Sequence, residues 1–349
     1  MVDVNKEVNR RSKLDTLGFL RGVAVIMVCF CHFAHALSSG HSLAVLFDYF
    51  YHIGALGVDV FFVISGFVIP FSLHAGKYVL QDYFRFLYKR LLRLHPPYLA
   101  ALALTLVVMY LSYRARHLVF PETTITILKS LAYLHIPADN PVFWTLGVEA
   151  QYYIFIGLFY LALNRWPVIS LFIGIPVILL LGETAVANYL SLFKFIVPFI
   201  LGTVGFRLYL KIGNQLHNWL ALGLVLCFSA FFYKLPVFVI TSITMFFILF
   251  YRRSIPGWLQ FPGKISYSIY LIHFIIGIKF INLVKPKIDP AYSWLLLIGT
   301  IVIVMFLSWL FYKIFEDYSE KLSKKIKYSA ATLRMAEKKP DEDIISVKA

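Results

Sequence analysis

Long apolar segments alternate with short polar ones along most of the chain. A helix needs about 20 predominantly apolar residues to cross the hydrocarbon core of a bilayer. About ten segments approach that length, so the pattern predicts an all-α, polytopic membrane protein, a bundle of about ten transmembrane helices. The segments are 17–37, 55–73, 96–111, 142–163, 168–181, 189–208, 218–232, 235–251, 265–278 and 292–314.

Composition supports this class, because 60% of the 349 residues are hydrophobic, 15% are charged, and the mean hydropathy is +0.76. The net charge of +15 would suit a nucleic-acid partner, but the positions of the charges argue against one. With the N-terminus in the cytoplasm, 24 of the 33 Lys and Arg residues fall in cytoplasmic segments and 7 in outer loops. This is the positive-inside distribution. We therefore predict membrane lipids, and no nucleic acid, as partners.

Three parts are predicted along the chain. They are a cytoplasmic N-terminal segment over 1–13, a ten-helix transmembrane domain over 14–320, and a charged cytoplasmic tail over 321–349. An even number of spans places both termini in the cytoplasm. The three cysteines show neither a disulfide framework nor metal-ligand spacing, and no metal site is predicted.

The first apolar segment contains an arginine and a histidine eleven residues apart, Arg21 and His32. Eleven residues of helix bring them back to nearly the same face, roughly 16 Å apart along the axis. Charged groups at membrane depth are costly, so they face a cavity or a partner rather than lipid. The pair therefore predicts a functional site. His35 follows one turn later, but two histidines without a placed carboxylate are weak evidence for a metal.

A basic segment lies between the second and third spans, over residues 81–94. Arg85, Lys89 and Arg93 share one helix face and Arg90 is adjacent, which predicts an amphipathic interfacial helix. We expect the sequence His-Pro-Pro at 95–97 to end it. The basic face either anchors lipid headgroups or clamps a phosphate, because guanidinium groups bind phosphates in bidentate fashion.

Five sequence blocks, in order, resemble the membrane-bound acyltransferase 3 family. The first is Leu-Arg-Gly-Val-Ala followed by a histidine, and the fourth is Phe-Trp-Thr-Leu-Gly-Val-Glu. The blocks lie at 20–32, 57–67, 90–96, 143–153 and 265–273, and the likeness extends from residue 14 to about 317. The family often has Glu-x-Pro at the end of its last span, where this chain has Glu-Asp-Tyr, so Glu316 is left out of the predicted site.

The resemblance implies a multi-pass enzyme of the bacterial inner membrane. Such an enzyme moves an acyl group, usually acetyl, from cytoplasmic acyl-CoA to a hydroxyl of a surface polysaccharide, a lipid-linked glycan or a small metabolite. By position in the motifs, Arg21, Arg90 and Arg93 match the family's donor-binding arginines. His32 and Glu149 match its catalytic histidine and acid. Acyl-CoA would be the donor and a glycan or glycolipid the acceptor, and a homo-oligomer is left open.

Acyl transfer to an alcohol needs a base for the hydroxyl, and His32 suits that role near neutral pH. His32 lies roughly 8 Å and Glu149 roughly 11 Å from the expected outer ends of their spans. Asp59 and His273 fall at similar depth, so we predict that four helices bring these groups into one layer. In this layer we expect Glu149 to orient or polarise His32. Asp59, Tyr270 and His273 are secondary candidates.

Simpler interpretations remain open for these residues. A buried histidine can be a packing residue bonded to a neighbour, and a buried carboxylate can be the structural partner of an arginine. The polar stripe of Ser266, Tyr270 and His273 on one helix face is more typical of interhelical hydrogen bonds. A transporter or flippase of a glycolipid or metabolite is the alternative function, although no inverted repeat is evident. A non-catalytic scaffold is a third.

Overall fold

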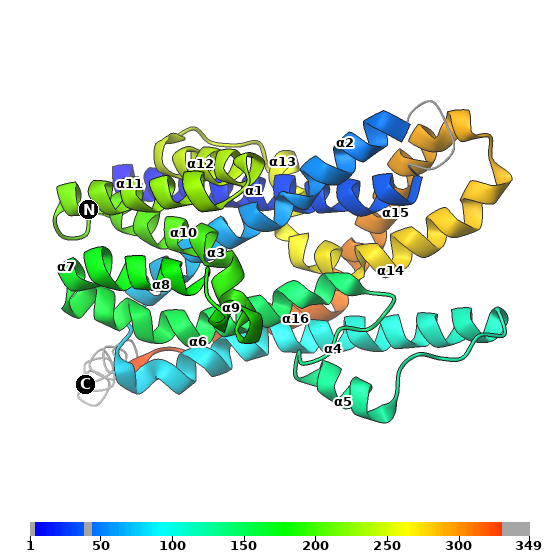
Figure 1. The fold of residues 1–349 in the computed structure, drawn as a ribbon, viewed down its shortest axis with the longest axis horizontal. Helices are drawn as coiled ribbons and strands as arrows, with labels where there is room; N and C mark the ends of the chain where they lie inside the picture. The colour runs from blue at the N-terminus through cyan, green and yellow to red at the C-terminus, as the bar shows by residue number, and fades with distance from the viewer. Residues whose placement is uncertain (1–3, 38–43, 330–349) are drawn as a thin grey trace, which may run out of the picture.

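The computed structural model describes residues 4–37 and 44–329, with side chains from residue 15 onward. This part of the chain is helical and contains no strand (Figure 1). The helices long and apolar enough to cross a membrane are Asp15–Leu37, Ala44–Ala75, Leu80–Ala115, Pro141–Arg165, Ser191–Tyr209, Gln215–Phe232, Ser266–Lys287 and Pro290–Lys324. Two shorter apolar helices, Pro167–Leu181 and Leu235–Phe250, occupy the remaining predicted positions. The all-α polytopic membrane class is confirmed, and within the described residues eight helices reach the length of a full crossing while two apolar helices are shorter.

The first half of the chain forms long helices, several of which continue directly into the next element. Helix α1 begins at Val4, so most of the segment 1–13 belongs to a helix. The elements are α1 (Val4–Leu37), α2 (Ala44–Ala55), α3 (Gly57–Ala75), η1 (Leu80–Asp82), α4 (Tyr83–Ala115), α5 (Thr124–Leu131), η2 (Pro141–Phe143) and α6 (Trp144–Arg165).

The second half contains shorter helices and two π-helical turns, η3 and η7. The predicted charged tail begins within the last described helix, and its residues 330–349 lie outside the described part. The elements are α7 (Pro167–Ile169), η3 (Ser170–Gly174), α8 (Ile175–Leu181), α9 (Val186–Tyr189), η4 (Ser191–Phe195), α10 (Ile196–Tyr209), α11 (Gln215–Phe232), α12 (Leu235–Phe250), α13 (Gly257–Lys264), α14 (Ser266–Val284), η5 (Lys285–Lys287), η6 (Pro290–Tyr292), α15 (Ser293–Phe311), η7 (Tyr312–Glu316) and α16 (Asp317–Lys324).

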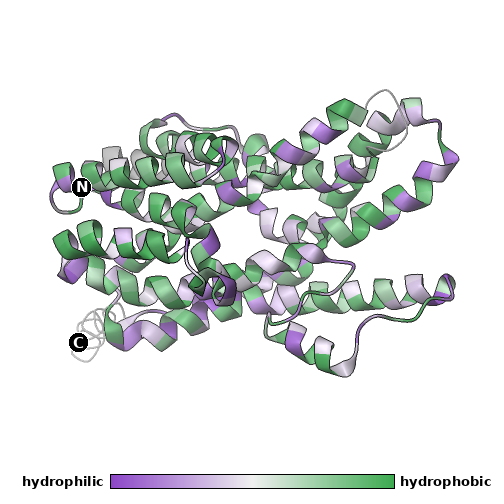
Figure 2. Ribbon diagram, in the orientation of Figure 1, coloured by the Kyte–Doolittle hydropathy of each residue, from purple (hydrophilic) through white to green (hydrophobic). Residues whose placement is uncertain are grey.

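Helices α1 and α4 run along the long axis of the molecule and link its two ends (Figure 1). Helices α6, α8, α10, α11 and α12 lie toward one end, and α2, α14 and α15 lie toward the other. The last described residue, Ser329, donates its backbone N–H to Asp82 next to the start of α4. Both described ends of the chain therefore lie at the same end of the molecule. Figure 2 shows hydrophobic residues along most of the helices and hydrophilic ones mainly at turns and helix ends.

Helix α4 corrects one expectation, because it continues through Pro96 and Pro97 instead of ending before them. Proline removes a backbone hydrogen bond, but inside a helical bundle neighbouring side chains can satisfy the carbonyls that are exposed nearby. The Tyr267 hydroxyl donates to the carbonyl of Leu94 at 2.8 Å, which ties α14 to α4 just before the prolines. The basic segment 81–94 is thus the first part of one long helix, and two of its arginines, Arg90 and Arg93, line a pocket inside the protein.

Helices α3 and α10 cross so closely that glycine is required at the contact. A Cβ on Gly66 would overlap the carbonyl of Phe199, and one on Gly202 would overlap the carbonyl of Val63. We expect Gly202→Ala to destabilise the protein by about 1–3 kcal/mol, the usual effect of overpacking. Gly223→Ala is the matched control, because a Cβ there would have no neighbour within 4 Å. Thermal unfolding of the two variants in detergent compares them, and equal unfolding temperatures would contradict the prediction.

Candidate active site

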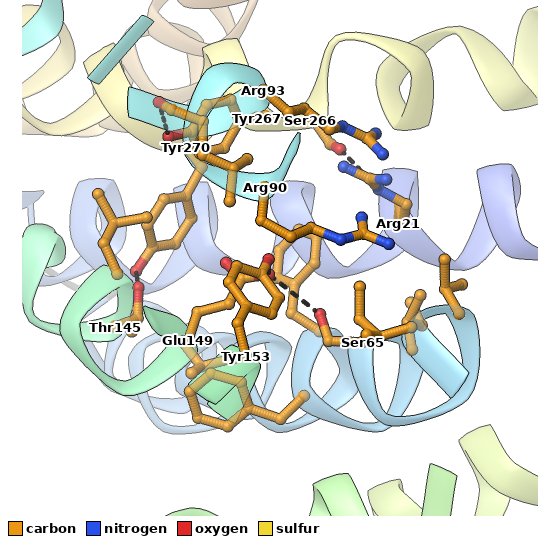
Figure 3. Close-up of a pocket in the computed structure, with 18 of the residues that line it drawn as sticks. Arg21, Ser65, Arg90, Arg93, Thr145, Glu149, Tyr153, Ser266, Tyr267 and Tyr270 are labelled. Atoms are coloured by element: carbon orange, nitrogen blue, oxygen red, sulfur yellow. Dashed lines mark hydrogen bonds between the residues drawn. The ribbon is translucent and has the colours of Figure 1, made fainter. Parts of the chain in front are cut away.

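A polar pocket lies inside the bundle, where α1, α3, α4, α6 and α14 meet (Figure 3). We call it the inner pocket, and its volume is about 100 Å³. It is lined by apolar and aromatic side chains, by the hydroxyl residues Ser65, Thr145 and Ser266, and by the charged residues Arg21, Arg90, Arg93, Glu149 and Glu316. All three arginines predicted from the sequence therefore share one cavity with the predicted acid.

Helix α1 presents Arg21 and His32 to α14, on one face as their spacing predicts. The Arg21 Nε donates to the Ser266 hydroxyl at 3.1 Å. Further along α1, the ring of His32 lies 5.4 Å from the ring of His273 and 5.0 Å from that of Phe274, measured between centroids. Arg21 thus belongs to the inner pocket, whereas His32 lies beyond it along the same two helices.

Arg90 extends from α4 across the inner pocket, toward the side where Arg21 lies (Figure 3). Its side chain is 7% exposed, and its guanidinium packs on the rings of Phe86 and Tyr153 at 5.6 and 5.8 Å. The Arg90 Nε is buried and has no hydrogen-bond partner among the described residues. A buried donor without a partner is costly, so this N–H is available to a ligand in the pocket.

Glu149 is held by neighbours other than the one expected. Its carboxylate accepts hydrogen bonds from the hydroxyls of Tyr153 and Ser65, the latter at 3.4 Å. Within the described part of the chain it makes no hydrogen bond to His32. The predicted direct contact between Glu149 and His32 is therefore not found.

The hydrogen bonds of α14 explain the difference in depth. Tyr270 bonds to Thr145, one turn before Glu149 on α6, with 2.6 Å between the hydroxyl oxygens. His273 lies one turn beyond Tyr270 on α14, next to His32. The histidines and Glu149 therefore lie at different depths in the bundle, with Tyr270 between them. The sequence-based prediction of equal depth counted residues from the expected helix ends, and it assumed that all helices end at the same depth.

His273 has a defined tautomer. It is fully buried, and its Nδ1 lies 3.0 and 2.9 Å from the carbonyl oxygens of Ile269 and Tyr270. Both partners are acceptors, so Nδ1 carries the proton and Nε2 of the neutral ring is an acceptor. The Nε2 is buried without a partner among the described residues. Asp59, the remaining secondary candidate, does not line the inner pocket.

Sequence reasoning missed several pocket residues. Ser65 was not among the predicted site residues, yet its hydroxyl donates to Glu149. Tyr153 and Tyr267 supply aromatic walls. Glu316, which was left out, lines the pocket, and its carboxylate accepts from the Ser268 backbone N–H at 3.0 Å and hydroxyl at 2.5 Å. Glu316 lies in a π-helical turn, and such turns are frequent at functional sites. A π-helical turn cannot be recognised in a sequence, so this signal was not accessible before the structure.

A second cavity of about 1220 Å³ adjoins the inner pocket and shares Arg21, Arg93 and Glu316 with it. We call it the vestibule. It is also lined by the cations Lys211, Arg252, Lys264, Lys321 and Lys324 and by the acids Asp317 and Glu320.

Two of the vestibule lysines are neutralised by those acids. Lys321 pairs with Asp317 and Lys324 with Glu320, each at 2.7 Å. By contrast, Lys211, Arg252 and Lys264 form no ion pair within the described residues. Arg252 lies over the ring of Tyr209 at 5.0 Å and Lys264 over that of Tyr312 at 5.8 Å. The vestibule is therefore a roomy basic chamber with aromatic surfaces.

These features define a class of protein: a helical membrane protein with a buried charged pocket that connects to a basic chamber. The sequence model of a family described as an acyltransferase domain, acyltransferase 3, matches residues 14–313. The chain belongs to this family and is an acyltransferase, and the resemblance in its motifs is confirmed. No curated protein and no solved structure gives a significant match.

Proposed function

We propose that the protein is an O-acyltransferase of the bacterial inner membrane. It transfers an acyl group, by default acetyl, from cytoplasmic acyl-CoA to a sugar hydroxyl of a surface polysaccharide or lipid-linked glycan. The observation that carries the proposal is the convergence of Arg21, Arg90 and Arg93 on an inner pocket that opens into the basic vestibule. Two imidazoles stand further along α1 and α14.

The vestibule suits the nucleotide end of the donor. Coenzyme A carries a pyrophosphate and a ribose phosphate, and Arg and Lys side chains bind phosphates through charge-assisted hydrogen bonds. Lys211, Arg252 and Lys264 remain free of carboxylates among the described residues, so their charges are available to these phosphates. Arg21 and Arg93 then stand where the vestibule narrows into the inner pocket, next to the path of the pantetheine arm.

The inner pocket suits the thioester. The unpartnered Nε of Arg90 can donate to the thioester carbonyl oxygen, on which negative charge develops during attack. Glu149, bound by Tyr153 and Ser65, supplies the carboxylate that offsets the arginine cluster. In this role Glu149 positions the arginines rather than His32.

His32 is the proposed base. It takes the proton of the acceptor hydroxyl as the hydroxyl oxygen forms a bond to the acyl carbon, and the bond from that carbon to sulfur breaks. The proton then passes to the leaving thiolate, which departs as free CoA. His273 presents an acceptor nitrogen next to His32 and acts as a positioning residue for the base or for the hydroxyl. Because His32 lies outside the inner pocket, the donor and the acceptor have to meet near Tyr270. The donor reaches it from the inner pocket and the acceptor from the side of His32.

Mass spectrometry of envelope glycans and glycolipids tests the function. Deletion cells complemented with the wild-type protein should regain an acyl mass increment that cells carrying the empty vector lack. The mass of the increment identifies the acyl group, and the species that carries it identifies the acceptor. If deletion changes no acylated glycan, the proposed acceptor class is wrong.

The vestibule gives a separate prediction for donor binding. Changing both Arg252 and Lys264 to alanine should raise the KM for acetyl-CoA about tenfold or more and leave kcat nearly unchanged, since their phosphate contacts are the same in the ground and transition states. Lys234→Ala is the control, because Lys234 is exposed and lies outside the vestibule. Steady-state kinetics in membrane vesicles measure both constants. An unchanged KM would exclude this chamber as the nucleotide site.

A further inference from the structure

A third cavity opens sideways between α4 and α6. We call it the lateral groove, and its volume is about 360 Å³. Its rim is formed by Tyr88, Leu91 and Ile154, which are 54%, 49% and 54% exposed. Exposed apolar side chains on a membrane helix face the lipid hydrocarbon. The groove therefore leads from an apolar outer surface of the molecule into the bundle.

The inner end of the groove is part of the wall of the inner pocket. Arg90, Glu149 and Tyr153 line both cavities. Their polar groups are directed elsewhere: the Arg90 guanidinium packs on two aromatic rings, and the Glu149 carboxylate is bound by Tyr153 and Ser65. What remains along the groove is mainly hydrocarbon and aromatic surface.

Helix α6 leaves room for the groove through one small side chain. Leu146, Ala150 and Ile154 follow at intervals of four residues and all line the groove. Ala150 is the middle of the three, so its methyl group leaves open a space that a larger residue would fill. The same helix carries Leu158 one turn beyond Ile154, and Leu158 is 50% exposed but lies outside the groove.

We propose that the lateral groove holds the hydrocarbon chain of the acyl donor, so that the enzyme accepts acyl groups longer than acetyl. This inference rests on the proposed function, in which the thioester lies in the inner pocket. That pocket has only about 100 Å³, enough for a small acyl group. A longer chain has to leave it, and the lateral groove continues from its wall into apolar surroundings.

The order of the three adjoining cavities favours the donor chain over a lipid acceptor as the occupant. Vestibule, inner pocket and lateral groove share side chains in that order, which matches the order of nucleotide, thioester and hydrocarbon in a long-chain acyl-CoA. A glycolipid entering the same way would have to bring a bulky polar headgroup through an opening lined by Tyr88, Leu91 and Ile154. Its hydroxyl would then arrive among the arginines rather than beside His32.

Donor binding as a function of chain length tests the proposal. The full-length protein in lipid nanodiscs is titrated with CoA, acetyl-CoA, octanoyl-CoA and dodecanoyl-CoA in competition with labelled CoA, and empty nanodiscs correct for partition into lipid. Each buried methylene should strengthen binding by up to about fourfold. In Ala150→Phe we expect the gain from the longer chains to be lost, with binding of acetyl-CoA unchanged. Leu158→Phe, which adds the same ring outside the groove, should behave as wild type.

The outcomes separate this inference from the proposed function. If acetyl-CoA and CoA bind but chain length has the same effect in Ala150→Phe and wild type, the groove does not hold the acyl chain. If Ala150→Phe stops acetyl transfer without altering the affinity of any donor, the groove admits the acceptor instead, and the proposal is overturned. Binding of no CoA ester at all would refute the proposed donor itself. Leu91→Trp is a second variant that fills the groove, from α4 instead of α6. If either Ala150→Phe or Leu91→Trp fails to fold, the other variant still tests the proposal.

Discussion

His32→Ala is expected to lower acyl transfer by about 10²–10⁴-fold, the usual contribution of a general base. The protein should remain folded and bind the donor normally, because His32 lies outside the inner pocket and the vestibule. Its ring packs on His273 and Phe274, so the substitution removes a ring contact and no hydrogen bond between described residues. Acyl transfer from labelled acetyl-CoA, with donor binding measured in parallel, gives both quantities.

The matched control for this prediction is His35→Ala. His35 lies one turn further along α1, is exposed, and packs on the ring of Tyr51 at 4.7 Å. It should retain activity close to wild type. If His32→Ala and His35→Ala have equal activities, His32 is not the base. If His32→Ala loses donor binding and activity together, the residue acts in folding or binding and not in proton transfer.

A substitution of His273 tests whether this residue positions His32. His273→Gln keeps a polar side chain but cannot present a ring nitrogen that is fixed by Nδ1 bonds to two carbonyls. We expect kcat to fall with the KM for the donor unchanged, and the fall to be smaller than that of His32→Ala, because His273 acts through its neighbour. Steady-state kinetics on both variants decide this, and a loss confined to donor KM would contradict the positioning role.

Helical periodicity was enough to predict the features that depend on one helix. Arg21 and His32 do face the same partner, because eleven residues complete nearly three turns. The apolar segments all fall on helices, since length and hydropathy determine them locally. The motif resemblance went further and grouped Arg21, Arg90 and Arg93, which line one pocket and which no single-helix argument could bring together.

Features that depend on how helices are placed relative to one another were beyond sequence reasoning. The relative positions of α6 and α14 along the bundle place Tyr270 between Glu149 and His32. No residue count within either helix predicts that offset. The prolines of α4 looked like a helix end because their cost is local, whereas the helix continues through them inside a bundle of helices that no local pattern shows. Ser65 and Glu316 entered the site for the same reason, through contacts between distant helices.

Arg90→Lys is expected to reduce kcat by about 10²-fold, the range reported for loss of one donor to a developing oxyanion. Lysine keeps the charge but has no Nε–H at the same position and does not form the planar stack on Phe86 and Tyr153. If Arg90 contacts the thioester oxygen mainly in the transition state, donor affinity should change little while kcat falls. This pattern is the opposite of that predicted for Arg252 and Lys264, whose loss raises KM.

Arg85→Lys is the control on the same helix. Arg85 is exposed and donates to Asp82 and Ser329, away from the inner pocket, so the variant should keep wild-type kinetics. Thermal unfolding of Arg90→Lys shows whether the packing on its two rings survives, and a folded variant with full kcat would remove Arg90 from the reaction. A fall in donor affinity as large as the fall in kcat/KM would mean that Arg90 binds a phosphate of the donor. The cationic face of α4 would then act as a phosphate clamp, the functional one of the two interpretations of that basic helix.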